Sequence, residues 1–216
     1  MLGIIIKDYY ETFCLKKNII GMLFSLSVVV LIVAFLHNLY SFILIVGITL
    51  PMMGASTLQS SLEQDGISKY DQILLTFPIT KKKIVDAKLI ATTALSLMTN
   101  FFVSLPISLI YIFLYQVTDF KTGMLIWFVG LILSFMMNAI NSMGFFWLGN
   151  KKGAIVYSIM IIVIVIGYFL INLNFDMEIL LQMKISTIIL ISILITIILN
   201  LISYFACIKI YTKKHS

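Results

Sequence analysis

Six long stretches of the chain are almost wholly apolar, and polar residues gather in the connections between them. In chain order the apolar stretches cover about 18–36, 39–58, 84–115, 123–148, 153–171 and 185–208. A transmembrane helix needs about 20 mostly apolar residues, because the hydrocarbon core of a bilayer is about 30 Å thick. The pattern therefore predicts an all-α polytopic membrane protein with six transmembrane helices.

The third apolar stretch is the longest and contains Pro106. Proline has no N–H to donate and its ring clashes with the preceding turn, so it bends or breaks a helix. We expect a kink or a functional bend at this position.

Composition agrees with this interpretation. The chain is 61% hydrophobic and only 11% charged, whereas soluble domains carry roughly 25% charged residues. Six spans and short connections use most of the 216 residues, which leaves no room for a fused catalytic domain. We expect one transmembrane domain over residues 1–216.

Lysines determine the predicted orientation, because positive charge is retained in cytoplasmic loops. With the N-terminus inside, thirteen of the fifteen lysines fall on the cytoplasmic side, and only Lys121 and Lys184 fall outside. Six spans return the C-terminus to the cytoplasm, where Lys213 and Lys214 lie. The sequence predicts an N-in, C-in protein of a bacterial plasma membrane.

Residues 1–17 place apolar side chains at helical spacing, and Lys7 and Glu11 form an i,i+4 pair on another face. This pattern is typical of an amphipathic helix that lies in the membrane interface. The alternative is a short cytoplasmic lead that only orients the first span.

The longest polar connection, 59–83, also carries a helical pattern. Ile67, Tyr70, Leu74 and Phe77 recur at i, i+3, i+7 and i+10, and Pro78 would end the helix. A helix over about 64–77, within a loop at 63–80, would either rest on the membrane or dock its apolar face into a soluble partner. A plain connection to the third span is the remaining alternative.

Motifs for catalysis or metal binding are missing from the sequence. The nearest phosphate-loop text, Gly149 to Gly153, lacks the spacing and the Ser/Thr of a nucleotide site, and only two histidines are present. Cys14 and Cys207 both fall near the cytoplasmic face, where thiols stay reduced. We expect no catalytic residue, metal, cofactor, disulfide or nucleic-acid partner for this chain.

The predicted span cores contain no ionisable residue that could carry protons or bind ions. Asp86 and Lys88 fall in the first turns of the third helix, near the cytoplasmic interface. Energy for uphill transport would therefore have to come from another subunit.

Uncharged polar residues form two stripes within the spans. They are Thr93, Ser96, Asn100 and Ser104 on the third span, and Ser134, Asn138 and Asn141 on the fourth. Such residues either pack by interhelical hydrogen bonds or line a substrate path. We expect Asn100 and Asn138 each to find a hydrogen-bond partner, favour packing for Asn138, and leave both alternatives open for Asn100.

The loop between the second and third spans resembles the corresponding segment of bacterial ABC-2 type permeases. The residues that carry the resemblance are Glu63, Lys69-Tyr70-Asp71, Leu74-Leu75, Phe77-Pro78-Ile79-Thr80-Lys81, Ile84-Val85 and Lys88. Lys81 stands where arginine is usual, and Phe77 where leucine is usual. The layout of the whole chain is similar to short permeases of this family, including those of phenol-soluble-modulin exporters and of bacteriocin export or immunity systems.

The resemblance implies an ABCG-like (type V) exporter transmembrane domain that pairs with a second permease copy or paralogue. A separate cytosolic ABC ATPase would hold ATP and Mg²⁺ and would contact the permease through the loop between spans two and three. The coupling residues implied are Glu63, Ile67, Tyr70, Asp71, Leu74, Phe77 and Pro78. Membrane lipids are a further expected partner, and the expected cargo is amphipathic or hydrophobic, with membrane-active peptides as one example.

Two other functions fit the same sequence. A non-transporting immunity or scaffold protein would sequester a toxin or anchor a partner, and an ATP-independent flippase or channel would act without an ATPase. Cargo identity, direction of transport and homodimeric or heterodimeric pairing stay open at this point.

Overall fold

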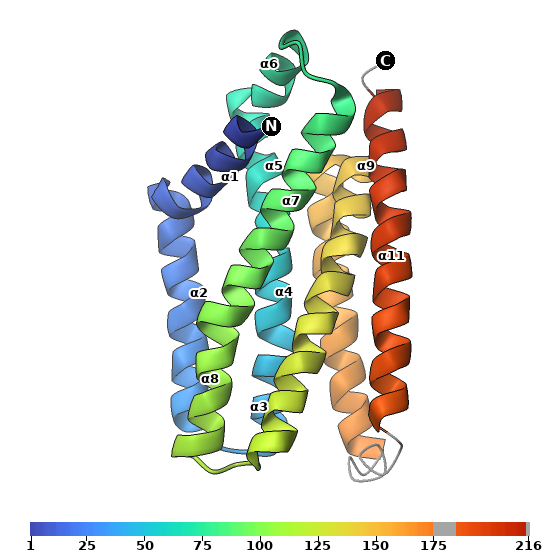
Figure 1. The fold of residues 1–216 in the computed structure, drawn as a ribbon. Coiled ribbons are helices and arrows are strands. Elements are labelled where there is room, and N and C mark those ends of the chain that lie inside the picture. The colour runs from blue at the N-terminus through green and yellow to red at the C-terminus, as the bar shows by residue number, and fades with distance from the viewer. Residues whose placement is uncertain (175–184, 215–216) are drawn as a thin grey trace.

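The computed structural model of the protein describes residues 1–174 and 185–214, and every element in these ranges is helical. Six helices are long and apolar enough to cross a membrane, which confirms the predicted fold class. They run side by side as a bundle, and the N-terminus, α6 and the C-terminal end of α11 lie at the same end (Figure 1). We call this the α6 end.

The first span is α2 (Lys16–Phe35), and α1 (Leu2–Cys14) lies across its start at the α6 end (Figure 1). The second and third spans are each made of several helical segments. The second joins α3 (Leu39–Phe42), η1 (Ile43–Thr49), α4 (Leu50–Ala55) and α5 (Thr57–Ser68), and the third joins α7 (Lys81–Thr99), η2 (Asn100–Ser104), α8 (Leu105–Leu109) and η3 (Ile110–Leu114). The fourth and fifth form α9 (Phe120–Asn174), and the sixth is α11 (Ile185–Lys214).

Gly149 separates the fourth span from the fifth. Its φ of 77° is non-helical, so the chain folds back there between the spans Phe120–Gly149 and Lys151–Tyr168. A side chain at this backbone angle would be strained, which explains the glycine.

Two prolines in the spans share one local structure. Pro51 and Pro106 each follow a leucine that comes directly after a π-helical segment, η1 or η2. In a π turn the N–H bonds five residues back, as Leu50 does to the carbonyl of Ile45 and Leu105 does to that of Asn100. The helix therefore passes through Pro106 without ending, and the irregularity expected there takes the form of π turns on both sides.

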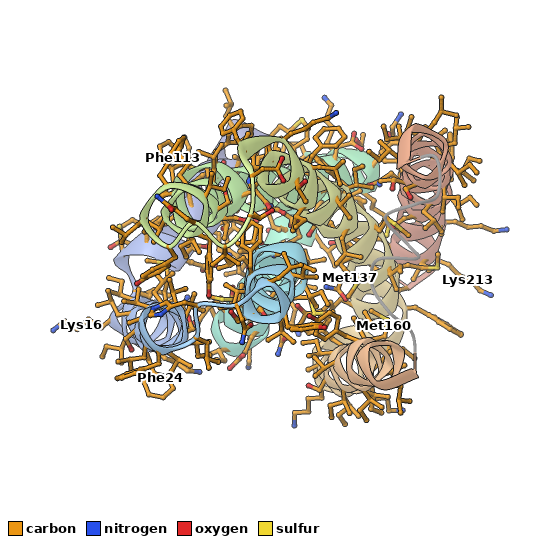
Figure 2. All side chains as sticks on the ribbon, turned by 90° about the horizontal axis from the view of Figure 1, so that it is seen from below. Lys16, Phe24, Phe113, Met137, Met160 and Lys213 are labelled. Atoms are coloured by element: carbon orange, nitrogen blue, oxygen red, sulfur yellow. The ribbon has the colours of Figure 1, made fainter. Side chains whose placement is uncertain are left out.

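The core is built mainly from spans two, three and four. Their apolar side chains form clusters that include Phe42, Ile45, Tyr111 and Trp127 near one end, and Met52, Leu58, Met137 and Phe145 nearer the α6 end. Figure 2 looks along the bundle and shows Met137 between helices, whereas Phe24 and Phe113 point away from the centre. α2 and α11 expose most of their apolar side chains, as a lipid-facing helix does.

Candidate functional site

The connection at the α6 end is divided by Lys69, whose φ of 53° is left-handed. The second span continues as α5 to Ser68, and a separate short helix, α6 (Tyr70–Thr76), follows. The single helix predicted over 64–77 is therefore wrong. A left-handed residue changes the direction of the chain, so side chains before and after Lys69 no longer share one helix face.

Leu74 shows the consequence most directly. The sequence pattern placed it on an outward docking face, but its side chain is only 1% exposed and packs with Ile84, Val85, Cys207 and Tyr211. Leu74 is thus a core residue that attaches α6 to the third and sixth spans. Its expected role as a docking anchor is wrong.

Other predicted coupling residues do reach the surface. Ile67, Phe77 and Pro78 are exposed. Ile73 and Leu75 are exposed too, although the predicted stripe did not include them. We call Ile67, Ile73, Leu75 and Phe77 the α6 surface. Asp71 also belongs to α6, but its side chain lies outside the described part.

Tyr70 and Glu63 connect this end of the molecule to the N-terminal helices. The Lys7 ammonium lies 4.4 Å from the centre of the Tyr70 ring, within range of a cation–π contact. Burial raises the pKa of the Tyr70 hydroxyl above its usual 10.0. Glu63 forms an ion pair of 3.0 Å with Lys17 at the start of α2.

A buried ionic network lies directly beneath α6. Asp65 of α5 pairs with both Lys7 of α1 and Lys88 of α7, and the side chains of Asp65 and Lys88 are no more than 4% exposed. Lys88 Nζ also lies 3.8 Å from Asp8 and donates to Ser61 Oγ at 3.1 Å. We call these charges, together with Glu11, the ionic network. It joins three helices that are distant in sequence.

The carboxylates of the ionic network are already paired with ammonium groups. Oxygens of Asp8, Glu11 and Asp65 lie within 4.8 Å of one another, and Lys7 and Lys88 place two positive charges against these three carboxylates. Burial acts to lower the pKa of Lys7, and hydrogen bonds to Asp65 and Glu11 outweigh it, so that this pKa is raised above 10.5. Burial raises the pKa of Glu11 above 4.5. Sequence analysis missed this network because it placed Lys88 in the cytoplasmic interface.

The polar stripe on the third span packs against the fourth. Ser96 and Ser134 hydroxyls are 2.6 Å apart, and the Asn100 amide donates to Ser134 Oγ at 3.1 Å and to the Ser96 carbonyl at 2.9 Å. The Trp127 indole donates to the Asn100 carbonyl at 3.3 Å. Asn100 is therefore a packing residue in this structure. Ser104 is also fully buried, with no hydrogen-bond partner for its hydroxyl among the described residues.

Carbonyl groups of the second span accept bonds from spans four and five. Asn141 donates to the Ala55 carbonyl at 3.3 Å, and the Tyr157 hydroxyl donates to that of Met52 at 2.5 Å. Gly130 approaches the same span so closely that a Cβ there would lie 2.6 Å from the Val46 carbonyl oxygen. Spans two and four thus meet backbone to backbone.

Asn138 behaves differently from its neighbours. Its side chain is only 2% exposed, yet neither its amide oxygen nor its amide nitrogen has a hydrogen-bond partner within the described ranges. The expected partner, and with it the preference for packing, is therefore not found. Instead Asn138 lines a cavity of about 400 Å³ between α7, α9 and α11, together with Asp86 and Thr93.

The family can be identified at this point. The structure has six spans, a short helix between spans two and three, and an N-terminal helix across the same end. Residues 3–212 match the family described as "ABC-2 family transporter protein". The chain belongs to this ABC-2 transporter family. No curated protein and no solved structure matches it. As an ABC-2 permease it is the membrane component of an ABC transporter, and the family implies an ABC ATPase as its partner.

Proposed function

We propose that this ABC-2 permease exports an amphipathic or hydrophobic cargo and is driven by a separate cytosolic ATPase that docks on the α6 surface. ATP and Mg²⁺ would bind to that ATPase, and two permease chains, identical or paralogous, would form the membrane part. The family membership supports the division between permease and ATPase.

The observation that carries this proposal is the arrangement of α6. Ile73 and Leu75 of α6 are exposed, as is Phe77 directly after it, whereas Leu74 on the same short helix is buried in the bundle. Exposed apolar side chains on a helix that is packed against the bundle through Leu74 suit a docking contact, because the partner meets a surface that is already ordered.

The attachments of α6 would carry movement into the membrane. α6 follows α5 directly through Lys69, and Leu74 joins it to α7 and α11. The ionic network then links α5 and α7 to α1. A displacement of α6 by an ATPase would therefore be passed to spans two and three together.

The charge distribution supports a cytoplasmic position for the α6 end. Lys69, Lys81, Lys82, Lys83, Lys151, Lys152, Lys213 and Lys214 lie in or beside the connections at that end. Positive residues favour cytoplasmic loops. Both termini would then face the cytoplasm, as an ATPase contact at α6 requires.

Copurification tests the proposal. The permease is expressed with its cognate ABC ATPase, and Phe77→Asp is compared with Phe77→Leu at the same exposed position. Because an apolar anchor is commonly worth more than about 1 kcal/mol, we expect Phe77→Asp to reduce the copurified ATPase at least about fivefold and Phe77→Leu to retain it. Equal recovery of the ATPase with both variants, each correctly inserted, would refute docking at this surface.

A further inference from the structure

The cavity beside Asn138 is acceptor-rich, and an apolar groove adjoins it. We propose that this composite site binds an amphiphile with a protonated primary amine at one end and an apolar chain at the other. The amine would lie between Asp86 and Asn138, and the chain would lie between spans three, four and six. That this ligand is cargo rests on the proposed transport function.

Two polar side chains in the cavity lack partners. Asn138 is 98% buried without a bond to either amide atom, and Asp86 Oδ1 is enclosed without a hydrogen-bond partner in the described residues. An unsatisfied buried polar group costs about 1–3 kcal/mol. A ligand that donates to Asp86 Oδ1 and Asn138 Oδ1 would remove the cost of those two oxygens, whereas Asn138 Nδ2 is a donor and would need an acceptor.

Apart from Tyr204, the other polar side chains around the cavity have already used their donors. The bonds are Thr92 to the Lys88 carbonyl, Thr93 to that of Leu89, Ser142 to that of Asn138, Ser203 to that of Ala139, and the Asn200 amide to those of Thr196 and Phe135. A hydroxyl has one proton but two lone pairs. The groups left to face a ligand are therefore mostly acceptors, which favour a donor such as an ammonium group.

The charges around the cavity also favour a cationic ligand. No lysine side chain lines the cavity, and the ion pairs of the described residues include none to Asp86. Met1 also lines the cavity and is 43% exposed; its α-ammonium is a positive charge there, and the described ion pairs include none between it and Asp86. The carboxylate of Asp86 would attract a cation and repel a phosphate, which disfavours an ordinary phospholipid headgroup.

The apolar part of the site adjoins the polar part directly. A groove of about 650 Å³ shares Thr93 and Asn200 with the cavity and is otherwise lined mainly by apolar side chains, including Leu97, Leu131 and Phe135. The order of the lining residues along α9 shows in which direction the site runs. Leu131 is farther from the α6 end than Asn138, so the groove leads from the polar cavity toward the other end of the bundle.

The depth of the site in the bilayer agrees with an amphiphile bound in the leaflet at the α6 end. The third span has 34 residues and is thus about 51 Å long, longer than the roughly 40–45 Å of a bilayer with its headgroups. Asp86 lies about 8 Å from the start of that span, and Asn138 lies about 16 Å from the turn at Gly149. The amine would therefore bind near headgroup level, and the chain would extend into the hydrocarbon.

Photocrosslinking on the purified full-length permease in maltoside detergent tests the site. The probe is hexadecylamine with a diazirine near the chain end, and the control probe is its N-acetyl derivative, which has the same chain but no charge. We expect saturable labelling of the groove by the amine, at roughly tenfold lower concentration than by the acetyl probe, because charge-assisted hydrogen bonds are lost in the latter. Equal labelling by the two probes would overturn the proposal.

Variants assign the effect to Asp86. Asp86→Asn should reduce labelling by the amine to the level of the acetyl probe, whereas Asp119→Asn, the same change in an exposed acid at the opposite end, should leave it unchanged. Asn138→Leu removes the amide from the cavity and should weaken the amine probe even if Asp86→Asn does not fold. Normal amine labelling in Asn138→Leu, or in a folded Asp86→Asn, would refute the site.

Competition and ATPase assays separate the remaining outcomes. Phosphatidylethanolamine, which carries an amine and a phosphate, should compete poorly, and strong competition would refute the discrimination against phosphate. Probe binding needs no ATPase, so a failed labelling experiment leaves the docking test at Phe77 intact. If labelling succeeds but the amine does not stimulate ATP hydrolysis by the assembled complex, the ligand is bound but is not cargo, which refutes only that part.

Discussion

Lys88 of the third span and Asp65 of the second form an ion pair inside the protein, where neither side chain is more than 4% exposed. The two residues are 23 positions apart and lie on opposite sides of α6 in the sequence. Lys7 pairs with the same aspartate from the N-terminal helix. The connection that carries α6 is therefore closed at its base by an ionic contact, and α1 is part of that contact.

Removal of one member of the Lys88–Asp65 ion pair should destabilise the protein strongly. We expect Lys88→Met to cost about 3–5 kcal/mol, because it leaves the buried Asp65 carboxylate with one ammonium fewer. Thermal unfolding in detergent measures the effect. Lys17→Met, which breaks the exposed pair with Glu63, is the control and should cost no more than about 1 kcal/mol. Similar losses in both variants would contradict the buried role.

Leu74 and Ile73 should separate packing from docking on one helix. Leu74→Ala removes a fully buried side chain and should cost about 2–5 kcal/mol of stability. Ile73→Ala changes an exposed side chain, and we expect unchanged thermal stability with weaker ATPase recovery. A stable Leu74→Ala protein would show that α6 is not held by this contact.

The two asparagines of spans three and four should respond in opposite ways to leucine. Asn100→Leu loses bonds to Ser134 and Ser96 and should lower stability by about 1–2 kcal/mol. Asn138→Leu breaks no described bond and should be neutral or stabilising. Unfolding midpoints of the two variants test this directly. A large loss in Asn138→Leu would mean that its amide has a partner that the cavity does not provide.

Alkaline titration should report on Lys7. Its pKa is raised above 10.5 on folding, so its contribution to stability is complete below pH 10.5 and is lost as the pH rises through the raised value. We expect the difference in unfolding temperature between the wild type and Lys7→Met to stay constant from pH 8 to about pH 10 and to shrink above pH 10.5. A difference that disappears by pH 9 would contradict the raised pKa.

Thiol labelling should report on orientation. Cys14 is exposed at the end of α1, whereas Cys207 is fully buried in the apolar cluster that also contains Leu74. In intact cells we expect Cys14 to react with a permeant maleimide and not with an impermeant one, because α1 would be cytoplasmic. Cys207 should react only after denaturation. Labelling of Cys14 by the impermeant reagent would reverse the proposed topology.

The spans could be predicted from the sequence because each one obeys the same requirement for about 20 apolar residues. The side chains that α6 exposes could not be predicted from the sequence. The period of Ile67, Tyr70, Leu74 and Phe77 assumes continuous helical backbone, and Lys69 interrupts it with a left-handed angle that residues other than glycine seldom adopt. Ile73 and Leu75 became visible as surface residues only once the break was known.

Pairings between distant segments explain the other differences. Asp8, Asp65 and Lys88 each look like interface charges when viewed alone, and only the packing of α1 beside α5 and α7 brings them together. Asn138 repeats the spacing of Ser134 and Asn141 along one helix face. Its neighbours on α7 and α11 leave space rather than a partner, which helical spacing on α9 cannot reveal.

The way α2 is attached has a mechanical consequence. Its described polar contacts to other helices are confined to its first turn, where Lys17 bonds to Glu63 and Asn18 to the Glu11 carbonyl. Beyond that turn α2 contacts the bundle through its own Val29 and Val33, which pack in an apolar cluster. Such contacts are non-directional, so the middle of α2 can shift against its neighbours without breaking a described hydrogen bond. Its two ends are the fixed points: the first turn, and Leu36 directly after the helix, whose carbonyl accepts hydrogen bonds from the hydroxyls of Ser41 and Tyr111.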